Sequence, residues 1–190
     1  LINPETSLGR GSLFEMKWEE VGPLLTKALA GEKNDERTEM GVVVQGLARA
    51  ANALTEKYSL TITNVPYLSS VKQGELLKNF CSRHYKDAKN DLATVFLERC
   101  LNLCSSVGTT AIVLPQNWLF LGGYKNFRVR LLKDMAWHSV VRLGPGAFET
   151  ISGEVVKAIL ITISNREQKT KNNRRFVGID LSDYKQVDEK

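Results

Sequence analysis

The stretch YSLTITNVPY, residues 58–67, decides the fold. Its apolar run from Tyr58 to Ile62 predicts a short buried strand over residues 59–63, because such runs are typical of strands inside a sheet. The Asn-Val-Pro-Tyr that follows predicts the point where the strand leaves the sheet. Pro66 restricts the residue before it to extended backbone, so the carbonyl of that residue can point out of the strand end.

The same four residues have a chemical meaning. Asn64 offers a side-chain carbonyl and Val65 a main-chain carbonyl, so two acceptors can hold the two hydrogens of one amino group. Tyr67 adds a flat ring on which a planar group can stack. The motif therefore suits an exocyclic amine on a heteroaromatic base or an amide nitrogen, and an ordinary strand-to-loop exit is the alternative interpretation.

Helical and strand patterns alternate along the rest of the chain. Apolar residues at 3.6-residue spacing predict a helix of about five turns that ends near Lys57. Its stripe consists of Met40, Val43, Val44, Leu47, Ala51 and Leu54. The other expected helices are Trp18–Ala30, Ser70–His84, Asp91–Cys104 and Tyr124–Met135, and the other expected strands are Thr110–Leu114 and, as the last two, Ser139–Leu143 and Val155–Ile163.

This alternation predicts an open, mostly parallel α/β sheet with helices on both faces. Ligands of such sheets bind beyond the carboxyl ends of the strands. Asn64 and Pro115 would both lie there. On the helix that starts at Asp91, we expect an inner face formed by Leu92, Val95, Phe96 and Leu103.

Three further segments carry a family resemblance. They are DLATVFLER at 91–99, GTTAIVLPQNWL at 108–119 and LGPGAFETISGEVV at 143–156. Together with Asn64–Tyr67, and in this order, they resemble the adenine-specific DNA methyltransferases, in particular the phage-growth-limitation (BREX-type) enzymes and the methylase subunits of restriction systems. The resemblance covers about residues 1–165. It implies the second half of a Rossmann-like methyltransferase sheet, mostly parallel with an antiparallel last strand.

The chain departs from that family in two places. Val65 stands where the family usually has the first proline of Asn-Pro-Pro-Tyr, which keeps the carbonyl acceptor but surrenders some rigidity. The glycine-rich cofactor motif is absent, because Gly9-Arg10-Gly11 follows no strand and Gly144-Pro145-Gly146 precedes no helix. We therefore expect an internal part of a longer enzyme. S-adenosylmethionine is the implied cofactor, and the chain alone is expected to be inactive.

The resemblance also assigns roles to residues. Asn64, Val65, Pro66 and Tyr67 are the implied catalytic motif, and Tyr67 and Phe148 are the implied stacking pair for the target base. Phe96 matches an aromatic residue that borders the adenine of the cofactor, although packing in the core is the other interpretation. The three cysteines lie in predicted helices and predict no metal site.

Charge divides the chain unevenly. Residues 1–60 carry 7 Lys and Arg against 9 Asp and Glu, whereas residues 61–190 carry 19 against 12. A basic part suits a phosphate-bearing partner, and solubility is the simpler explanation. The densest basic cluster is Arg166, Lys169, Lys171, Arg174 and Arg175. We expect residues 1–57 to be a helical lead-in, 58–165 the catalytic half and 166–190 a basic linker or tail.

Taken together, the sequence predicts a site-specific DNA adenine methyltransferase of the restriction-modification or phage-defence type. Double-stranded DNA is the expected partner, with other subunits of such a system as further candidates. No apolar run is long enough to cross a bilayer, so we expect a cytoplasmic protein without a membrane partner. Two alternatives stay open. One is a protein glutamine methyltransferase, and the other is a non-catalytic nucleic-acid-binding module on the same fold.

Overall fold

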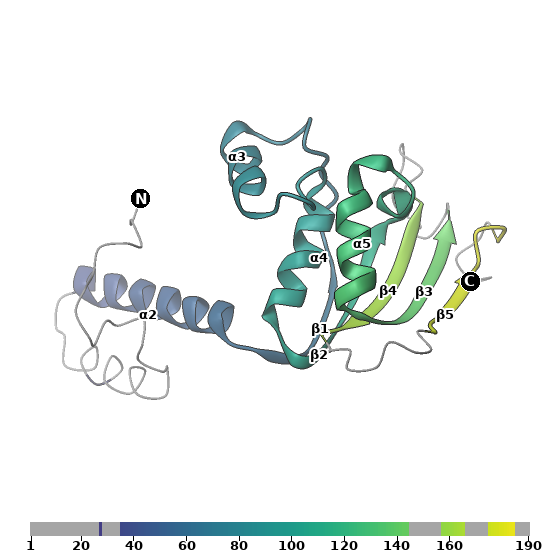
Figure 1. Cartoon of the computed structure of the whole chain (residues 1–190). Helices are drawn as coiled ribbons and strands as arrows, with labels where there is room; N and C mark the ends of the chain where they lie inside the picture. Colours follow the sequence, from purple (N-terminus) through teal and green to yellow (C-terminus); the bar gives the residue numbers. More distant parts are fainter. Residues whose placement is uncertain (1–26, 28–34, 145–156, 166–174, 185–190) are drawn as a thin grey trace. The chain divides into compact units, whose positions relative to one another are not determined.

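The computed structural model describes residue 27 and residues 35–144, 157–165 and 175–184 (Figure 1). The chain divides into two compact units, residues 1–56 and 57–190. Most of the helix expected at Trp18–Ala30 lies outside the described residues. The same holds for Phe148 and for four residues of the basic cluster, namely Arg166, Lys169, Lys171 and Arg174.

The described part of the first unit is the helix α2, Asp35–Thr55. It confirms the five-turn helix predicted to end near Lys57. Its last turn is joined by a hydrogen bond of 2.7 Å from Asn52 Nδ2 to Glu56 Oε1. The apolar stripe is exposed within this unit, with Met40 and Leu47 at 67% and 66% of their full accessibility. Burial within the unit therefore does not explain the stripe.

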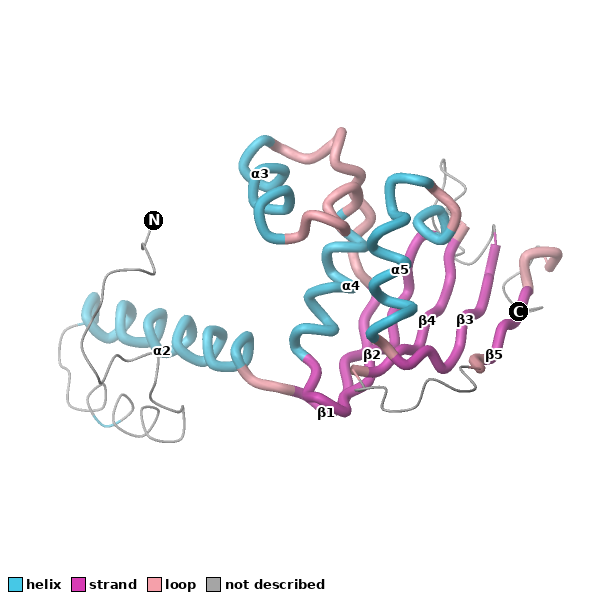
Figure 2. The backbone as a smooth tube through the Cα atoms, viewed as in Figure 1, coloured by secondary structure: helices cyan, strands magenta, loops and turns pink. Residues whose placement is uncertain are grey.

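The second unit contains a five-stranded mixed sheet (Figure 2). Its strands are β1 Tyr58–Asn64, β2 Cys104–Pro115, β3 Ala136–Gly144, β4 Ala158–Ser164 and β5 Val177–Asp180, in the spatial order β1-β2-β4-β3-β5. The pairs β1–β2 and β3–β5 are parallel, whereas β4 is antiparallel to both of its neighbours. Four strands therefore run in one direction and β4 runs against them. This confirms the prediction of a mostly parallel sheet with an antiparallel strand after β3.

The prediction that β4 is the final strand is wrong. β5 follows it and pairs with β3 from Ser139↔Val177 to Arg142↔Asp180. Its segment was expected to be part of a basic linker or tail. Four residues are too few to show an alternating pattern, so the sequence carried little signal. The contact with β3 is close at Gly144, where φ is +67° and a Cβ atom would lie 2.7 Å from Ser182 Cα.

Three helices and two 3-10 turns accompany the sheet. They are α3 Glu75–His84, α4 Leu92–Leu103, η1 Gln116–Leu119, η2 Gly122–Tyr124 and α5 Lys125–Asp134. The predictions for α4 and α5 are confirmed to within one residue at each end. The helix expected from Ser70 instead begins at Glu75, because the residues before it form a loop that bonds to the start of α4.

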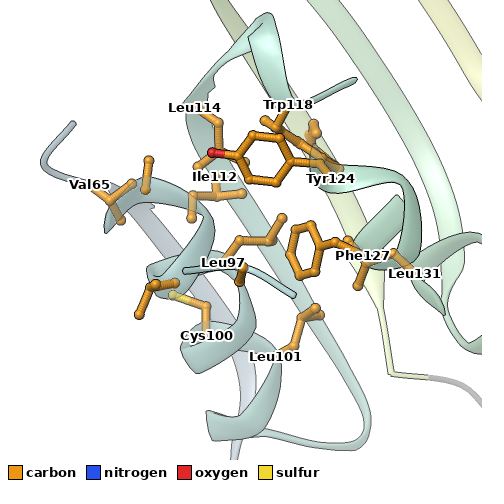
Figure 3. Close-up of a cluster of buried hydrophobic side chains, with 14 of the residues drawn as sticks. Val65, Leu97, Cys100, Leu101, Ile112, Leu114, Trp118, Tyr124, Phe127 and Leu131 are labelled. Atoms are coloured by element: carbon orange, nitrogen blue, oxygen red, sulfur yellow. The ribbon is translucent and has the colours of Figure 1, made fainter. Parts of the chain in front are cut away.

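The core lies between the sheet and the pair α4 and α5 (Figure 3). α4 contributes Leu97 and Leu101, and α5 contributes Phe127 and Leu131. β2 and β4 supply the sheet side with Ile112, Leu114, Ile159, Ile161 and Ile163, each at most 2% exposed. Figure 3 shows Val65 on the flank of this cluster nearest Ile112, away from Phe127 and Leu131.

Helices α4 and α5 cover the same face of the sheet. The opposite face exposes apolar side chains within the unit, among them Ile62 at 73% and Leu60 at 52%. The strand expected at residues 59–63 is therefore present as part of β1, but the prediction that it is buried is wrong. The expected second helical layer is not among the described residues of this unit. The covered face is therefore the one that fixes the strands in place and positions their carboxyl ends.

Candidate functional site

The carboxyl ends of β1 and β2 form one edge of the sheet. The two strands are parallel, and Asn64, the last residue of β1, pairs with Val113 two residues before the end of β2. β3 ends at the same edge with Gly144, which pairs with Ala158 at the beginning of β4. Crevices at this edge are where open α/β sheets bind ligands, so the strand ends place Asn64 at a candidate site.

Asn64 and Val65 have opposite environments. The Asn64 side chain is exposed and makes no hydrogen bond with any described residue, whereas Val65 is 6% exposed and belongs to the core cluster. Pro66, the next residue, is exposed. Burial of Val65 fixes the backbone where the strand ends, and the amide of Asn64 remains available to a ligand. Such an arrangement presents a rigidly mounted acceptor.

Tyr67 is partly buried and packs against the core cluster. Its hydroxyl is buried and has no hydrogen-bond partner among the described residues. Burial, with the negative charge of Asp91 as the second cause, raises the pKa of Tyr67 to about 12. The phenol is therefore neutral at physiological pH, and only part of the ring can be offered to a ligand.

The loop after Tyr67 is fastened to the start of α4 by its backbone. The Leu92 amide donates to the Leu68 carbonyl at 2.9 Å, and the Ser70 amide donates to the Asn90 carbonyl at 2.9 Å. These bonds place the first turn of α4 beside the Asn64–Tyr67 segment. Two segments that are separated by α3 in the sequence therefore form one side of the site.

Phe96 does not lie on the inner face of α4, so that prediction is wrong. Its side chain is 37% exposed. The buried residues of the helix are Ala93, Thr94, Val95, Leu97, Cys100 and Leu101. The interior stripe is thus centred on Leu97, and Phe96 lies to one side of it, because neighbouring residues of a helix are about 100° apart. The core does not account for this aromatic side chain.

The segment after β2 forms the 3-10 turn η1. Its N-cap is Pro115, and no side chain caps it. Trp118 is fully buried and Asn117 is exposed. Arg128 holds the turn, since its Nη1 donates to the carbonyls of Trp118 and Leu121 at 2.7 and 2.6 Å. No local pattern around Arg128 indicated this role.

A charged pair at the end of β3 and β5 was also missed. Arg142 Nη1 lies 2.5 Å from Asp180 Oδ2, and Arg142 Nε donates to Gln116 Oε1 at 3.4 Å. Hydrogen bonds from Ser182, and then the charge of Arg142, lower the pKa of the exposed Asp180. Pairing of β5 with β3 creates this contact, which is why no local pattern could reveal it.

The remaining predicted site residues are mostly outside the described part of the chain. Of the basic cluster, Arg175 alone is described, and it is exposed. Cys81, Cys100 and Cys104 are buried and form no disulfide. Across residues 35–144, 157–165 and 175–184, no three His, Cys, Asp or Glu side chains converge in a way that could hold a metal ion.

Comparison with known structures gives the class of the fold. The chain superimposes on a protein from Listeria monocytogenes described as a class I S-adenosylmethionine-dependent methyltransferase, with a TM-score of 0.51 and 10% identity over 68% of this chain and 38% of the other. At that level of identity the likeness concerns the fold alone. The sheet is that of an S-adenosylmethionine-dependent methyltransferase.

The family follows from the sequence match. Residues 15–148 match the model of the Eco57I restriction-modification methylase family, and the chain belongs to that family. It is 32% identical over 126 residues to the adenine-specific methyltransferase PglX of Lacticaseibacillus casei (strain Zhang), covering 65% of this chain and 10% of that protein. It is 29% identical over 160 residues to the adenine-specific methyltransferase BrxX of Escherichia coli O9:H4 (strain HS), covering 82% of this chain and 13% of that protein.

The chain thus spans about a tenth of the length of the curated relatives it matches. No helix among its described residues is long and apolar enough to span a membrane.

Proposed function

We propose that this chain is the part of an S-adenosylmethionine-dependent DNA adenine methyltransferase that holds the target amine. The observation that carries the proposal is Asn64, an exposed asparagine without a hydrogen bond to any described residue, mounted on the buried Val65 at the carboxyl end of a methyltransferase sheet. The family and the names of the two adenine-specific relatives support the same substrate class.

The chemistry follows from the properties of the amine. The nitrogen lone pair of adenine is delocalised into the ring, so the amine is a poor nucleophile. Asn64 Oδ1 and the Val65 carbonyl would accept its two hydrogens and favour a pyramidal nitrogen whose lone pair is free. As the new N–C bond forms and the S–C bond of the methyl donor breaks, the amine loses one hydrogen as a proton. Donors and acceptors placed before the reaction are the main means of such catalysis.

The target base must leave the duplex to reach this edge. Extrusion costs a few kcal/mol, and stacking on an aromatic side chain recovers roughly 1–3 kcal/mol per base. Tyr67 is the described candidate for that contact, and Phe148 is proposed for the other side of the base. The positive charge of residues 61–190, with Arg166, Lys169, Lys171, Arg174 and Arg175 as the densest cluster, would bind phosphates.

S-adenosylmethionine would supply the methyl group. Among the described residues, Phe96 fits a place beside it, because its side chain is exposed and outside the core. The glycine-rich cofactor motif was not recognised in the sequence, so we expect the isolated chain to bind S-adenosylmethionine weakly or not at all. Calorimetry on residues 1–190 tests this, and a low micromolar dissociation constant would contradict it.

The experiment for the proposed function is methylation by the complete protein. Duplex DNA and a glutamine-containing peptide are each incubated with tritiated S-adenosylmethionine, and the DNA is then digested to nucleosides. Label in N6-methyladenine supports the proposal. Label in the peptide alone would favour a glutamine methyltransferase, and DNA binding without any label would favour a non-catalytic module.

A further inference from the structure

One carboxylate bonds to both the Tyr67 loop and the first turn of α4. Asp91 Oδ1 accepts a hydrogen bond from the Ala93 amide at 2.9 Å, which caps the helix, and another from the Leu68 amide at 3.3 Å. Asp91 is only 9% exposed. Since both bonds end on the same oxygen, the carboxylate fixes the position of the loop relative to the helix.

Leu68 is held from its other side as well. Its carbonyl accepts from the Leu92 amide at 2.9 Å and from Gln73 Nε2 at 3.0 Å. Ser69 and Asp91 form an antiparallel bridge. Both backbone polar groups of Leu68 are therefore used, and each is bonded to residues at the start of α4 or to the loop before α3.

The candidate motif lies between two fixed points. Val65 is anchored in the core, and Leu68 is anchored through Asp91, so only Pro66 and Tyr67 separate the anchors. A segment this short has few conformations once both ends are fixed. The direction of the Val65 carbonyl, and the position of Asn64 next to it, then depend on the anchor at Leu68 as well as on the strand.

We propose that Asp91 is a positioning residue of the methyltransferase, holding the Leu68 amide so that Asn64 and the Val65 carbonyl meet the target amine in the required geometry. This inference rests on the proposed function. Asp91 does not touch the amine in this account. Its effect on the reaction passes through Leu68.

Asn165 supplies a matched control at the opposite end of the same helix. Its Nδ2 donates to the Leu101 carbonyl at 2.6 Å and to the carbonyls of Cys104 and Ser105 at 3.3 Å each. Asn165 therefore caps the carboxyl end of α4 as Asp91 caps the amino end. None of these bonds involves the Asn64–Tyr67 segment, so a general weakening of α4 should be common to both variants, and loop positioning should be specific to Asp91.

The test compares Asp91→Ala, Asp91→Asn, Asp91→Ser and Asn165→Ala in the complete protein. Amide hydrogen exchange is measured over residues 65–74, and kcat and KM are measured for methylation. In Asp91→Ala the Leu68 amide should exchange at least about tenfold faster, because without its acceptor the loop can open without unfolding of the rest of the protein. The same variant should lose at least about tenfold in kcat with little change in KM, because misplacement of the catalytic group slows the chemical step.

The other variants separate capping from positioning. Asp91→Asn keeps an oxygen for both bonds, so its kcat should stay within about threefold of the wild type. Asp91→Ser keeps a capping oxygen on a shorter side chain and should fold, yet lose kcat as Asp91→Ala does. Asn165→Ala should leave both the exchange of Leu68 and kcat unchanged.

Wild-type kcat and exchange in Asp91→Ser would overturn the inference, as would equal losses in Asn165→Ala. The two proposals fail differently. If Asn64→Ala retains methylation, the proposed function is wrong. If Asn64→Ala is inactive while Asp91→Ala and Asp91→Ser are fully active, the positioning role alone is wrong.

Discussion

The two edges of the sheet use their polar groups differently. At the carboxyl edge, the Asn64 amide makes no hydrogen bond with any described residue. Asn64 is exposed, so a ligand can reach its amide directly. The Tyr67 hydroxyl and Gln73 Oε1 in the segment after β1 are buried.

At the opposite edge, polar side chains from different strands bond to one another. Ser164 Oγ lies 2.8 Å from Thr109 Oγ1 and 2.7 Å from His138 Nε2. The Asn165 amide nitrogen donates to three carbonyls near the end of α4, and its buried Oδ1 has no partner among the described residues. Hydrogen bonds here join strands and helix to one another, which is what a purely structural edge requires.

This difference identifies the polar group that remains available to a ligand. The Ser164, Thr109 and His138 side chains of the opposite edge bond to one another, whereas the exposed Asn64 amide makes no hydrogen bond with the described residues and can bind a ligand. We therefore predict that substitution of the exposed Asn64 changes the reaction with little effect on stability, and that substitution of Ser164 at the opposite edge does the reverse.

The largest expected effect is that of Asn64→Ala. Methyl transfer at saturating DNA should fall by at least about 100-fold, as happens when one group of a preorganised electrostatic site is removed. DNA affinity and the unfolding midpoint should not change, because Asn64 is exposed and unbonded to described residues. Asn102→Ala is the matched control, because Asn102 is also an exposed asparagine but lies at the carboxyl end of α4. Wild-type turnover in Asn64→Ala would remove the basis of the amine-holding role.

Tyr67→Ala should have the next largest effect. Loss of stacking should weaken extrusion of the target base by about 1–3 kcal/mol, and Tyr67→Trp should be tolerated because the ring face matters more than the hydroxyl. The emission of 2-aminopurine at the target position reports the extrusion. A mismatch opposite the target lowers the unstacking cost and should partly rescue Tyr67→Ala. Equal defects on matched and mismatched duplexes would make Tyr67 a structural residue.

Ser164→Ala tests the opposite edge. It leaves Thr109 and His138 without their shared partner, so the free energy of unfolding should fall by about 1–1.5 kcal/mol in urea titrations. Methylation by the folded protein should be unchanged. A loss of kcat at a temperature where the variant is fully folded would show that the two edges are not separate in function.

The smallest effect concerns pH. Burial raises the pKa of Tyr67 from 10.0 to about 12, so the neutral phenol is favoured in the folded state. The resulting stabilisation is fully present below pH 10 and is lost as the pH rises from 10.0 to about 12. Tyr67→Phe lacks this contribution, and the stability of the wild type should therefore fall more steeply than that of Tyr67→Phe above pH 10. Parallel unfolding curves over that range would mean that the hydroxyl is hydrated in the folded protein.

Sequence patterns predicted the elements whose local signal is strong. β1 and β2 were indicated by the apolar runs at Tyr58–Ile62 and Thr110–Leu114, and α2 by helical periodicity. β5 was not predicted, because its four residues gain their structure from pairing with β3. The first turn expected for α3 was wrong because Ser69 and Ser70 bond to the loop before α4 instead.

The residues of the candidate site also divide into those with a local sequence signal and those without one. Asn64 and Tyr67 were recognisable because they form one contiguous motif whose chemistry can be read locally. The contacts of Arg128 and Arg142, and the second hydrogen bond of Asp91 to Leu68, join segments that are far apart in the sequence. Phe96 was assigned to the inner face because an aromatic residue on a helix usually packs, and the actual stripe of α4 is centred one residue later.

A structure of the complete protein bound to its DNA site is the most direct test of whether Asn64 holds the target amine. The quantity to measure is the distance from the N6 atom of the target adenine to Asn64 Oδ1. We predict an adenine outside the duplex with its N6 atom within hydrogen-bond range, about 2.7–3.2 Å, of Asn64 Oδ1 and with its ring against Tyr67. A target adenine held at another part of the protein, with the Asn64 amide facing solvent, would contradict it.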